Sequence, residues 1–160
     1  MTEGGMTLIV KNITRLVTGF IAVFGIYIAL TGHLSPGGGF AGGVILAAAA
    51  ILVVLAFGSN FASKLVTEPI CHVADAAGAL SFLCVALCGY FVGSFSFFVN
   101  FVGLGQIGSF WSGGTILISN LAILVKVGAG LAGVFLALAA FRRTTPGQVF
   151  DPEAQTRREV

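Results

Sequence analysis

Four long apolar stretches dominate this chain and constrain its fold more than any other feature. They cover about Ile13–Thr31, Phe40–Phe57, Ala76–Val99 and Thr115–Phe141. A helix that crosses a bilayer needs roughly 20 predominantly apolar residues, and these stretches meet that requirement. Membrane-spanning strands alternate apolar and polar residues over segments of about 10 residues, and these stretches do not alternate. The sequence therefore predicts an all-α membrane protein with four transmembrane helices.

The composition and the start of the chain agree with this prediction. Of the 160 residues, 57% are hydrophobic and 9% are charged, whereas a soluble domain has about 25% charged residues. Lys11 and Arg15 flank the first stretch, but Glu3 lies ahead of them and no small-residue cleavage site clearly follows. We therefore expect the first stretch to be a retained helix rather than a signal peptide.

The basic residues predict how the chain lies in the membrane. All of them except Lys126 lie at or before the start of the first stretch, between the second and third, or after the fourth. The loops Gly32–Gly39 and Asn100–Gly114 contain no lysine or arginine. Because cytoplasmic loops carry an excess of these residues, we expect both termini and the second loop, about Gly58–Asp75, in the cytoplasm. Residues 1–141 would form the membrane domain and residues 142–160 a polar cytoplasmic tail.

Lys126 is the first candidate for chemistry, because it lies near the centre of the fourth stretch. It follows Thr115 by about 11 residues, which is about 16 Å in a helix, and its stem cannot carry the charge that far to water. A charge at the centre of a bilayer costs at least about 2.5–3.5 kcal/mol. Its side of the helix carries small or polar residues, namely Thr115, Ser119, Ala122, Ala129, Gly130, Gly133 and Ala137.

Two interpretations of Lys126 remain open. It could hold the assembly together by pairing with carbonyls or a carboxylate of a partner. It could instead lie on an ion or proton path, together with Ser119 and Asn120, because burial readily shifts the pKa of a lysine. No carboxylate is expected within the four stretches. We therefore expect compensation of Lys126 to come from an acid of another subunit or from an internal water path, which points to a complex.

A second group of candidates is Glu68, His72 and Asp75, just before the third stretch. If a helix begins near Thr67 and Pro69, these three residues share one face of it. We expect them at the cytoplasmic mouth, either as a solvated surface or as a funnel that collects protons or admits ions. The cysteines Cys71, Cys84 and Cys88 lack zinc-type spacing, so neither a metal site nor a cofactor is predicted.

The string "GHLSPGGGFAGG", Gly32–Gly43, joins the first two stretches. Ser35, Pro36 and Gly37 suit a tight turn, and the string lacks the lysine of a phosphate-binding loop. His33 is a candidate titratable group on the outer side. We expect close helix packing at glycines, and the candidates are Gly38, Gly39, Gly42, Gly43, Gly113, Gly114, Gly130 and Gly133.

The same string resembles the signature of the MnhB/MrpB family, membrane subunits of multisubunit Na⁺/H⁺ antiporters. The shared pattern is Gly-His-x-x-Pro-Gly-Gly-Gly-Phe-x-Gly-Gly. Weaker similarity continues through Asp75–Leu80, Ser112–Gly114 and Asn120–Leu131. Related modules occur in energy-converting membrane-bound hydrogenases and respiratory complexes. The stretch Lys126–Leu131 resembles those versions, because the antiporter subunit often lacks a lysine there.

The resemblance implies a small subunit of a prokaryotic cell membrane that assists larger subunits in exchanging Na⁺ for H⁺. Its partners would be the other membrane subunits of such an antiporter and the lipid bilayer, with no nucleic acid. The alternatives are the same module within a hydrogenase or related redox complex, and a purely structural scaffold. The sequence contains no recognisable nucleophile or cofactor motif, so a transporter subunit is expected rather than an enzyme.

Overall fold

The computed structural model describes residues 6–58, 68–92, 96–106, 108–109 and 111–144; for Glu68 and residues 140–144 it describes the backbone only. Among these residues four helices follow one another: α1 (Leu8–Leu30), α2 (Gly39–Phe57), α4 (Glu68–Val92) and α5 (Thr115–Thr144). Each is long and apolar enough to cross a membrane. The predicted all-α architecture with four transmembrane helices is confirmed, while the orientation of the termini stays a prediction. Lys64 and most of the predicted tail lie outside the described residues.

The predicted limits of the third span were wrong. Helix α4 begins at Glu68 and ends at Val92, so it starts and stops about two turns earlier than expected. The chain after it turns back onto the last turns of α4, where the Tyr90 and Phe97 rings stack with centroids 5.2 Å apart. A Cβ on Gly89 would lie 2.8 Å from the backbone nitrogen of Val99. These aromatic residues therefore cover the end of the helix rather than extend it.

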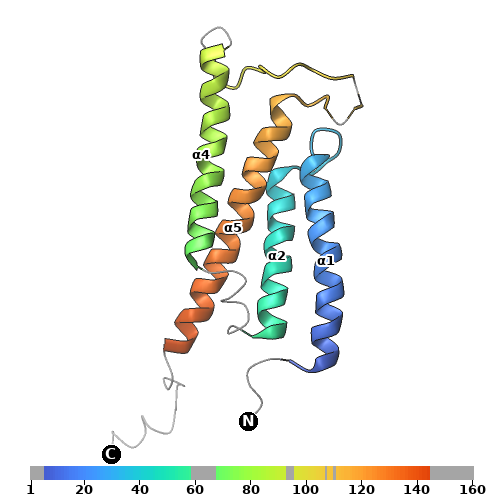
Figure 1. The fold of residues 1–160 in the computed structure, drawn as a ribbon, viewed down its shortest axis with the longest axis vertical. Helices are drawn as coiled ribbons and strands as arrows, with labels where there is room; N and C mark the ends of the chain where they lie inside the picture. The colour runs from blue at the N-terminus through green and yellow to red at the C-terminus, as the bar shows by residue number, and fades with distance from the viewer. Residues whose placement is uncertain (1–5, 59–67, 93–95, 107, 110, 145–160) are drawn as a thin grey trace, which may run out of the picture.

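The four helices form a row rather than a closed bundle (Figure 1). The contacts run from α1 to α2, from α2 to α5 and from α5 to α4, and α1 makes a smaller contact with α5. No comparable contact joins α4 to α1 or α2 among the described residues. Helix α5 consequently lies between α2 and α4, and much of the surface on both sides of the row is open.

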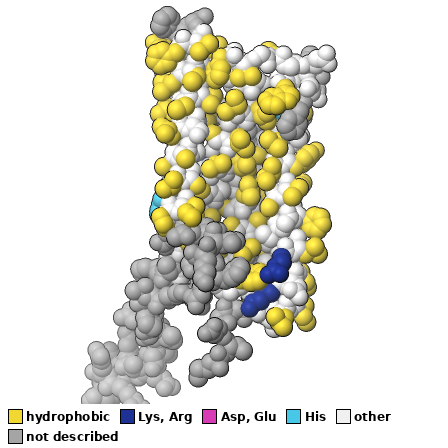
Figure 2. Space-filling view, viewed as in Figure 1, with side chains coloured by type: hydrophobic (Ala, Val, Ile, Leu, Met, Phe, Trp, Pro, Cys, Tyr) yellow, Lys and Arg dark blue, Asp and Glu magenta, His cyan; other side chains and the backbone are white. Residues whose placement is uncertain are grey.

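Small residues hold the row together, as is usual where helices pack inside a membrane. The buried apolar positions are mostly alanines: Ala29, Ala47, Ala49, Val54, Ala56, Cys71, Val85, Ala86, Leu117, Ala122, Leu124 and Ala132. Many large apolar side chains are exposed instead. Figure 2 shows hydrophobic side chains over most of one face, and the Lys and Arg side chains that it colours lie near the lower end. This surface suits contact with lipid or with other membrane helices.

Two adjacent glycines in α2 pack against two different helices. A Cβ on Gly42 would lie 2.5 Å from the carbonyl oxygen of Gly25 in α1, and one on Gly43 would lie 2.8 Å from Cβ of Val127 in α5. Real Cβ atoms do not come this close to other heavy atoms. The Gly42–Gly43 pair therefore allows α2 to approach α1 on one side and α5 on the other.

Candidate functional site

An ion pair joins helices α4 and α5, which lie at one end of the row. The ammonium nitrogen of Lys126 on α5 donates a hydrogen bond to the Oδ1 atom of Asp75 on α4, at 3.0 Å. Lys126 lies near the middle of the apolar span of α5, Thr115–Ala139. Asp75 lies about two turns inside α4, about 10 Å from its first residue at the rise of a helix. Both charges therefore lie within helices that are apolar enough to cross the membrane.

The expectation that no carboxylate lies within the spans was wrong. Asp75 is inside the span Pro69–Val92 and provides the acid that was expected from another subunit. The reason is the earlier start of α4, which converts the residues before Ala76 from a loop into two helical turns. An isolated lysine at this depth would be an uncompensated charge, and the carboxylate of Asp75 compensates it within the same chain.

Glycines bring α4 and α5 close enough for the pair to form. Gly78 follows Asp75 by one helical turn and lies on the same face. A Cβ on Gly78 would lie 2.8 Å from the backbone nitrogen of Lys126 and 2.9 Å from the carbonyl oxygen of Ala122. A Cβ on Gly130 would lie 3.4 Å from Oδ1 of Asp75. The backbone of α5 therefore packs against α4 directly above and below the pair.

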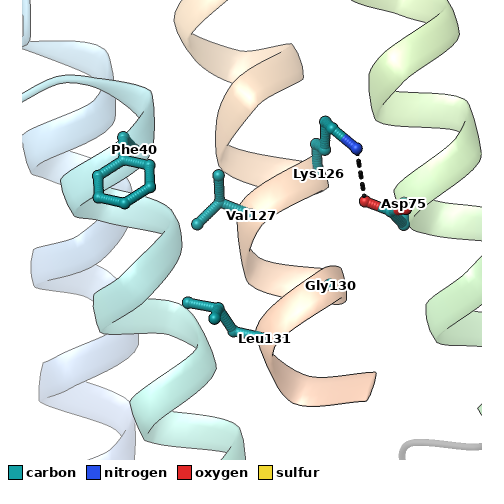
Figure 3. Close-up of a pocket in the computed structure, with 6 residues that line it drawn as sticks. All are labelled: Phe40, Asp75, Lys126, Val127, Gly130 and Leu131. Atoms are coloured by element: carbon teal, nitrogen blue, oxygen red, sulfur yellow. Dashed lines mark hydrogen bonds and ion pairs between the residues drawn. The ribbon is translucent and has the colours of Figure 1, made fainter. Parts of the chain in front are cut away.

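The pair is not enclosed by this chain. The side chain of Lys126 is 47% exposed and that of Asp75 is 41% exposed. They border a shallow recess of about 260 Å³ that spans α2, α5 and α4. It is lined by Phe40, Asp75, Lys126, Val127, Gly130 and Leu131, and Figure 3 shows Phe40 and the ion pair on opposite sides of α5. The charges therefore face an opening at membrane depth.

A second recess places His72 near the pair. It measures about 250 Å³ and is lined by Cys71, His72, Asp75, Ala129, Gly130, Gly133, Val134 and Ala137. Asp75 and Gly130 line both recesses. Glu68 is the first residue of α4, and its side chain lies outside the described residues. Among the residues that the structure describes, no group of three His, Cys, Asp or Glu side chains is arranged to hold a metal ion.

The other candidates lie at the opposite end of α5, where the glycine string meets it. A Cβ on Gly39 would overlap the carbonyl oxygen of Asn120, and one on Gly32 would lie 3.0 Å from Nδ2 of Asn120. Ser119 donates a hydrogen bond from Oγ to the carbonyl of Thr115, at 3.0 Å. The structure thus gives Ser119 and Asn120 contacts within this helix junction and does not bring them to the Lys126–Asp75 pair.

His33 packs over the start of α5. A Cβ on Gly113 would lie 2.9 Å from Cγ of His33. Both ring nitrogens of His33 are buried and have no hydrogen-bond partner in the described part of the chain. Buried polar atoms normally have a partner, so these two nitrogens are exceptions among the described residues.

Sequence reasoning missed two residues with clear local roles. Gly78 sets the distance between α4 and α5, and the spacing of Asp75 and Gly78 in "DAAG" was the available signal. Asn100 accepts a hydrogen bond at Oδ1 from the backbone nitrogen of Thr115, at 3.1 Å, and so caps the start of α5. Asn100 lies far from Thr115 in sequence, so no local pattern indicated this contact.

Comparisons with known proteins agree with this architecture. A family model described as "Domain related to MnhB subunit of Na+/H+ antiporter" matches residues 9–133. A Na⁺/H⁺ antiporter subunit of Bacillus subtilis is 37% identical over 95 residues, 59% of this chain and 62% of the relative. A protein of Methanocaldococcus jannaschii is 36% identical over 139 residues, 81% of this chain and 51% of the relative.

A solved structure is similar as well. A chain in the membrane-bound sulfane sulfur reductase, an archaeal respiratory membrane complex, is 31% identical with a TM-score of 0.71. The match covers 86% of this chain and 60% of that chain. This chain therefore spans between about half and two thirds of these relatives. Because the family model covers well over half of its residues, this multi-pass membrane protein belongs to the family of domains related to the MnhB subunit of Na⁺/H⁺ antiporters.

Proposed function

We propose that this chain is a non-catalytic membrane subunit of a multisubunit cation/proton antiporter and contributes to both ion translocation and assembly. One observation supports this proposal above the others, namely the Lys126–Asp75 pair at 3.0 Å within the apolar spans. Ionisable residues inside transmembrane segments are rare and commonly mark ion or proton pathways. The name of the Bacillus subtilis relative and the description of the family model give the cation as Na⁺ for those proteins.

The pair has the chemistry that coupling of two ions requires. A cation that approaches the Asp75 carboxylate competes with the Lys126 ammonium for its single negative charge. A proton that neutralises the carboxylate also releases the ammonium, because their attraction depends on both charges. Either event changes the charge and the position of the lysine head. Cation occupancy and proton occupancy therefore exclude one another at Asp75.

The row of helices needs other subunits to form such a path. Water and ions cross a membrane inside a cavity shielded from lipid, and a single layer of four helices does not enclose one. The half-exposed pair and the recess beside it form one wall only. We therefore assign the opposite wall to a neighbouring subunit, which makes assembly part of the function.

The orientation that we propose for the chain in the membrane follows from the distribution of its lysines and arginines, and it is consistent with the position of the site. With both termini in the cytoplasm, the start of α4 and the end of α5 lie on the cytoplasmic side. Glu68 and His72 then lie between the cytoplasm and Asp75, and His72 lines a recess together with it. This order supports a cytoplasmic funnel leading to the pair. His33, Ser119 and Asn120 would lie toward the outer side.

A second candidate function is the same module inside a redox-driven complex. It is favoured by the similarity to a chain of an archaeal respiratory membrane complex, at 31% identity and a TM-score of 0.71. In that setting electron transfer in other subunits would drive the ion flow. We propose no resident cofactor for this chain in either setting.

Purification of a tagged copy in mild detergent, followed by reconstitution into vesicles, tests the proposal. We expect several membrane subunits to co-purify and an imposed Na⁺ gradient to drive protons in the opposite direction. Co-purification of an iron–sulfur or nickel subunit would favour the redox complex. A chain that purifies alone, or a complete complex that moves no protons under a Na⁺ gradient, would contradict the antiporter proposal.

A further inference from the structure

The recess beside the ion pair forms a distinct surface, which we name the ion-pair face. Its members are Phe40, Asp75, Lys126, Val127, Gly130 and Leu131. Helix α5 forms its floor, with α2 on one side and α4 on the other (Figure 3). Phe40 is 67% exposed and Leu131 is 42% exposed. The surface is therefore an open groove with an apolar side and a charged side.

Hydrogen bonding at the ion-pair face is incomplete. The Lys126 ammonium has three N–H donors, and one of them donates to Asp75. No other partner of either charged group is found among the described residues. The remaining donors and the second carboxylate oxygen lie on a surface that is nearly half exposed. Lipid chains offer no hydrogen bonds, so they are a poor covering for this groove.

The opposite face of the row has a different character. It carries a recess of about 250 Å³ lined by Ala77, Gly78, Ser81, Ile118, Leu121, Ala122 and Val125. None of these residues is charged, and the Ser81 hydroxyl already donates to the carbonyl of Ala77, at 2.7 Å. Lipid chains can cover that face without leaving a charge unsatisfied. Of these two faces, only the ion-pair face has charged groups that need a polar partner.

We propose that a transmembrane helix of another subunit packs along the ion-pair face and presents an uncharged hydrogen-bonding side chain to Asp75 and Lys126. The pair is already neutral overall, so a charged partner would add an uncompensated charge at membrane depth. A serine, threonine, asparagine or glutamine can use the free donors and acceptors. The absence of a side chain at Gly130 leaves room for it, and Phe40 and Leu131 match an apolar helix. This inference deepens the proposed function by naming the second wall of the path.

Photo-crosslinking in native membranes tests this assignment. The probe p-benzoylphenylalanine replaces Phe40, which it resembles in shape, or Leu131. In a third variant, the control, the probe replaces Val125. This residue faces the other side of α5 and, like Leu131, is 42% exposed. After irradiation, the tagged chain is isolated and its adducts are identified by mass spectrometry. Assembly of each probe-bearing complex is verified on a native gel before irradiation.

We expect Phe40 and Leu131 probes to form adducts with a transmembrane segment of another subunit, several-fold more than the Val125 probe does. That segment should carry a serine, threonine, asparagine or glutamine near the crosslinked position. Lipid adducts alone from an assembled complex, or equal protein adducts from both faces, would overturn the docking surface. A partner segment that is entirely apolar or carries a charge there would overturn its stated chemistry.

The transport assay separates this inference from the proposed function. If the probes crosslink as expected but neutralising the pair leaves ion exchange unchanged, the docking surface stands and the ion path fails. If exchange depends on the pair but the probes find only lipid, the ion path stands and the docking surface fails.

Discussion

The backbones of Gly78 and Lys126 lie in direct contact, so that a Cβ added to Gly78 would be 2.8 Å from the amide nitrogen of Lys126. The same Cβ would be 2.9 Å from Cα of Lys126 and from the carbonyl oxygen of Ala122. All three atoms belong to the backbone of α5, and none can rotate away. The ion pair between Asp75 and Lys126 therefore depends on the absence of a side chain at position 78.

Gly78→Ala should push α4 away from α5 and weaken the complex. Overpacking of a close contact costs typically about 1–3 kcal/mol, so we expect a lower thermal unfolding midpoint of the purified complex. Gly19→Ala is the matched control, because a Cβ on Gly19 meets nothing within 4 Å. An equal loss of stability in both variants would show that the close contact at Gly78 is not responsible.

Charge compensation between Asp75 and Lys126 should appear as non-additive effects on assembly. Asp75→Leu leaves the ammonium without its partner, and Lys126→Met leaves the carboxylate without its partner. Either single variant should reduce the assembled fraction on a native gel, and the double variant should restore part of it. Residues in direct contact show coupling of about 0.5–3 kcal/mol. Simple addition of the two single effects would mean that the pair contributes nothing to assembly.

Asn100→Ala should destabilise the start of α5. The side-chain oxygen of Asn100 accepts a hydrogen bond from the Thr115 amide at 3.1 Å, and loss of such a cap costs about 0.5–2 kcal/mol. We expect faster hydrogen exchange at the first amides of α5. Asn12→Ala in the exposed face of α1 is the control, since Asn12 is exposed. Unchanged exchange at Thr115 and its neighbours in Asn100→Ala would contradict the capping role.

The proposed orientation predicts which positions a membrane-impermeant maleimide reaches in intact cells. Leu34→Cys, between α1 and α2, should be labelled from outside, above the background of the native cysteines. Thr7→Cys, directly before α1, should be labelled only after the cells are permeabilised. The reverse pattern would place both termini outside and would remove the cytoplasmic funnel.

Much of the fold could be predicted because membrane spans leave a strong local signal. Length and the absence of alternation identified four helices, and three of them lie close to the predicted ranges. The predicted range of the third helix was wrong because the apolar aromatic residues after Val92 resemble a membrane span in composition. In the structure they pack back onto α4. The polar residues before Ala76 resembled a loop, although Pro69 already indicated a helix start.

The candidate site was predicted only in part, for a related reason. Lys126 stood out because a lysine within an apolar helix has no local compensation. Its partner did not, because a misplaced helix start put Asp75 outside the membrane. Contacts between distant segments, such as Gly39 with Asn120 and Asn100 with Thr115, depend on how the helices pack. No periodicity in a single stretch of sequence contains that information.

The central claim is that the Lys126–Asp75 pair lies on the ion path, and Na⁺/H⁺ exchange by the Lys126→Met complex tests it most directly. Exchange is measured in vesicles and normalised to the assembled complex, with the double variant Asp75→Leu/Lys126→Met as an assembly control. Lys11→Met, outside the site at the start of α1, controls for loss of a lysine. We predict a loss of at least about tenfold, equivalent to about 1.4 kcal/mol, in both pair variants and none in Lys11→Met. Unchanged exchange by an assembled Lys126→Met complex would contradict the account and leave this chain a scaffold.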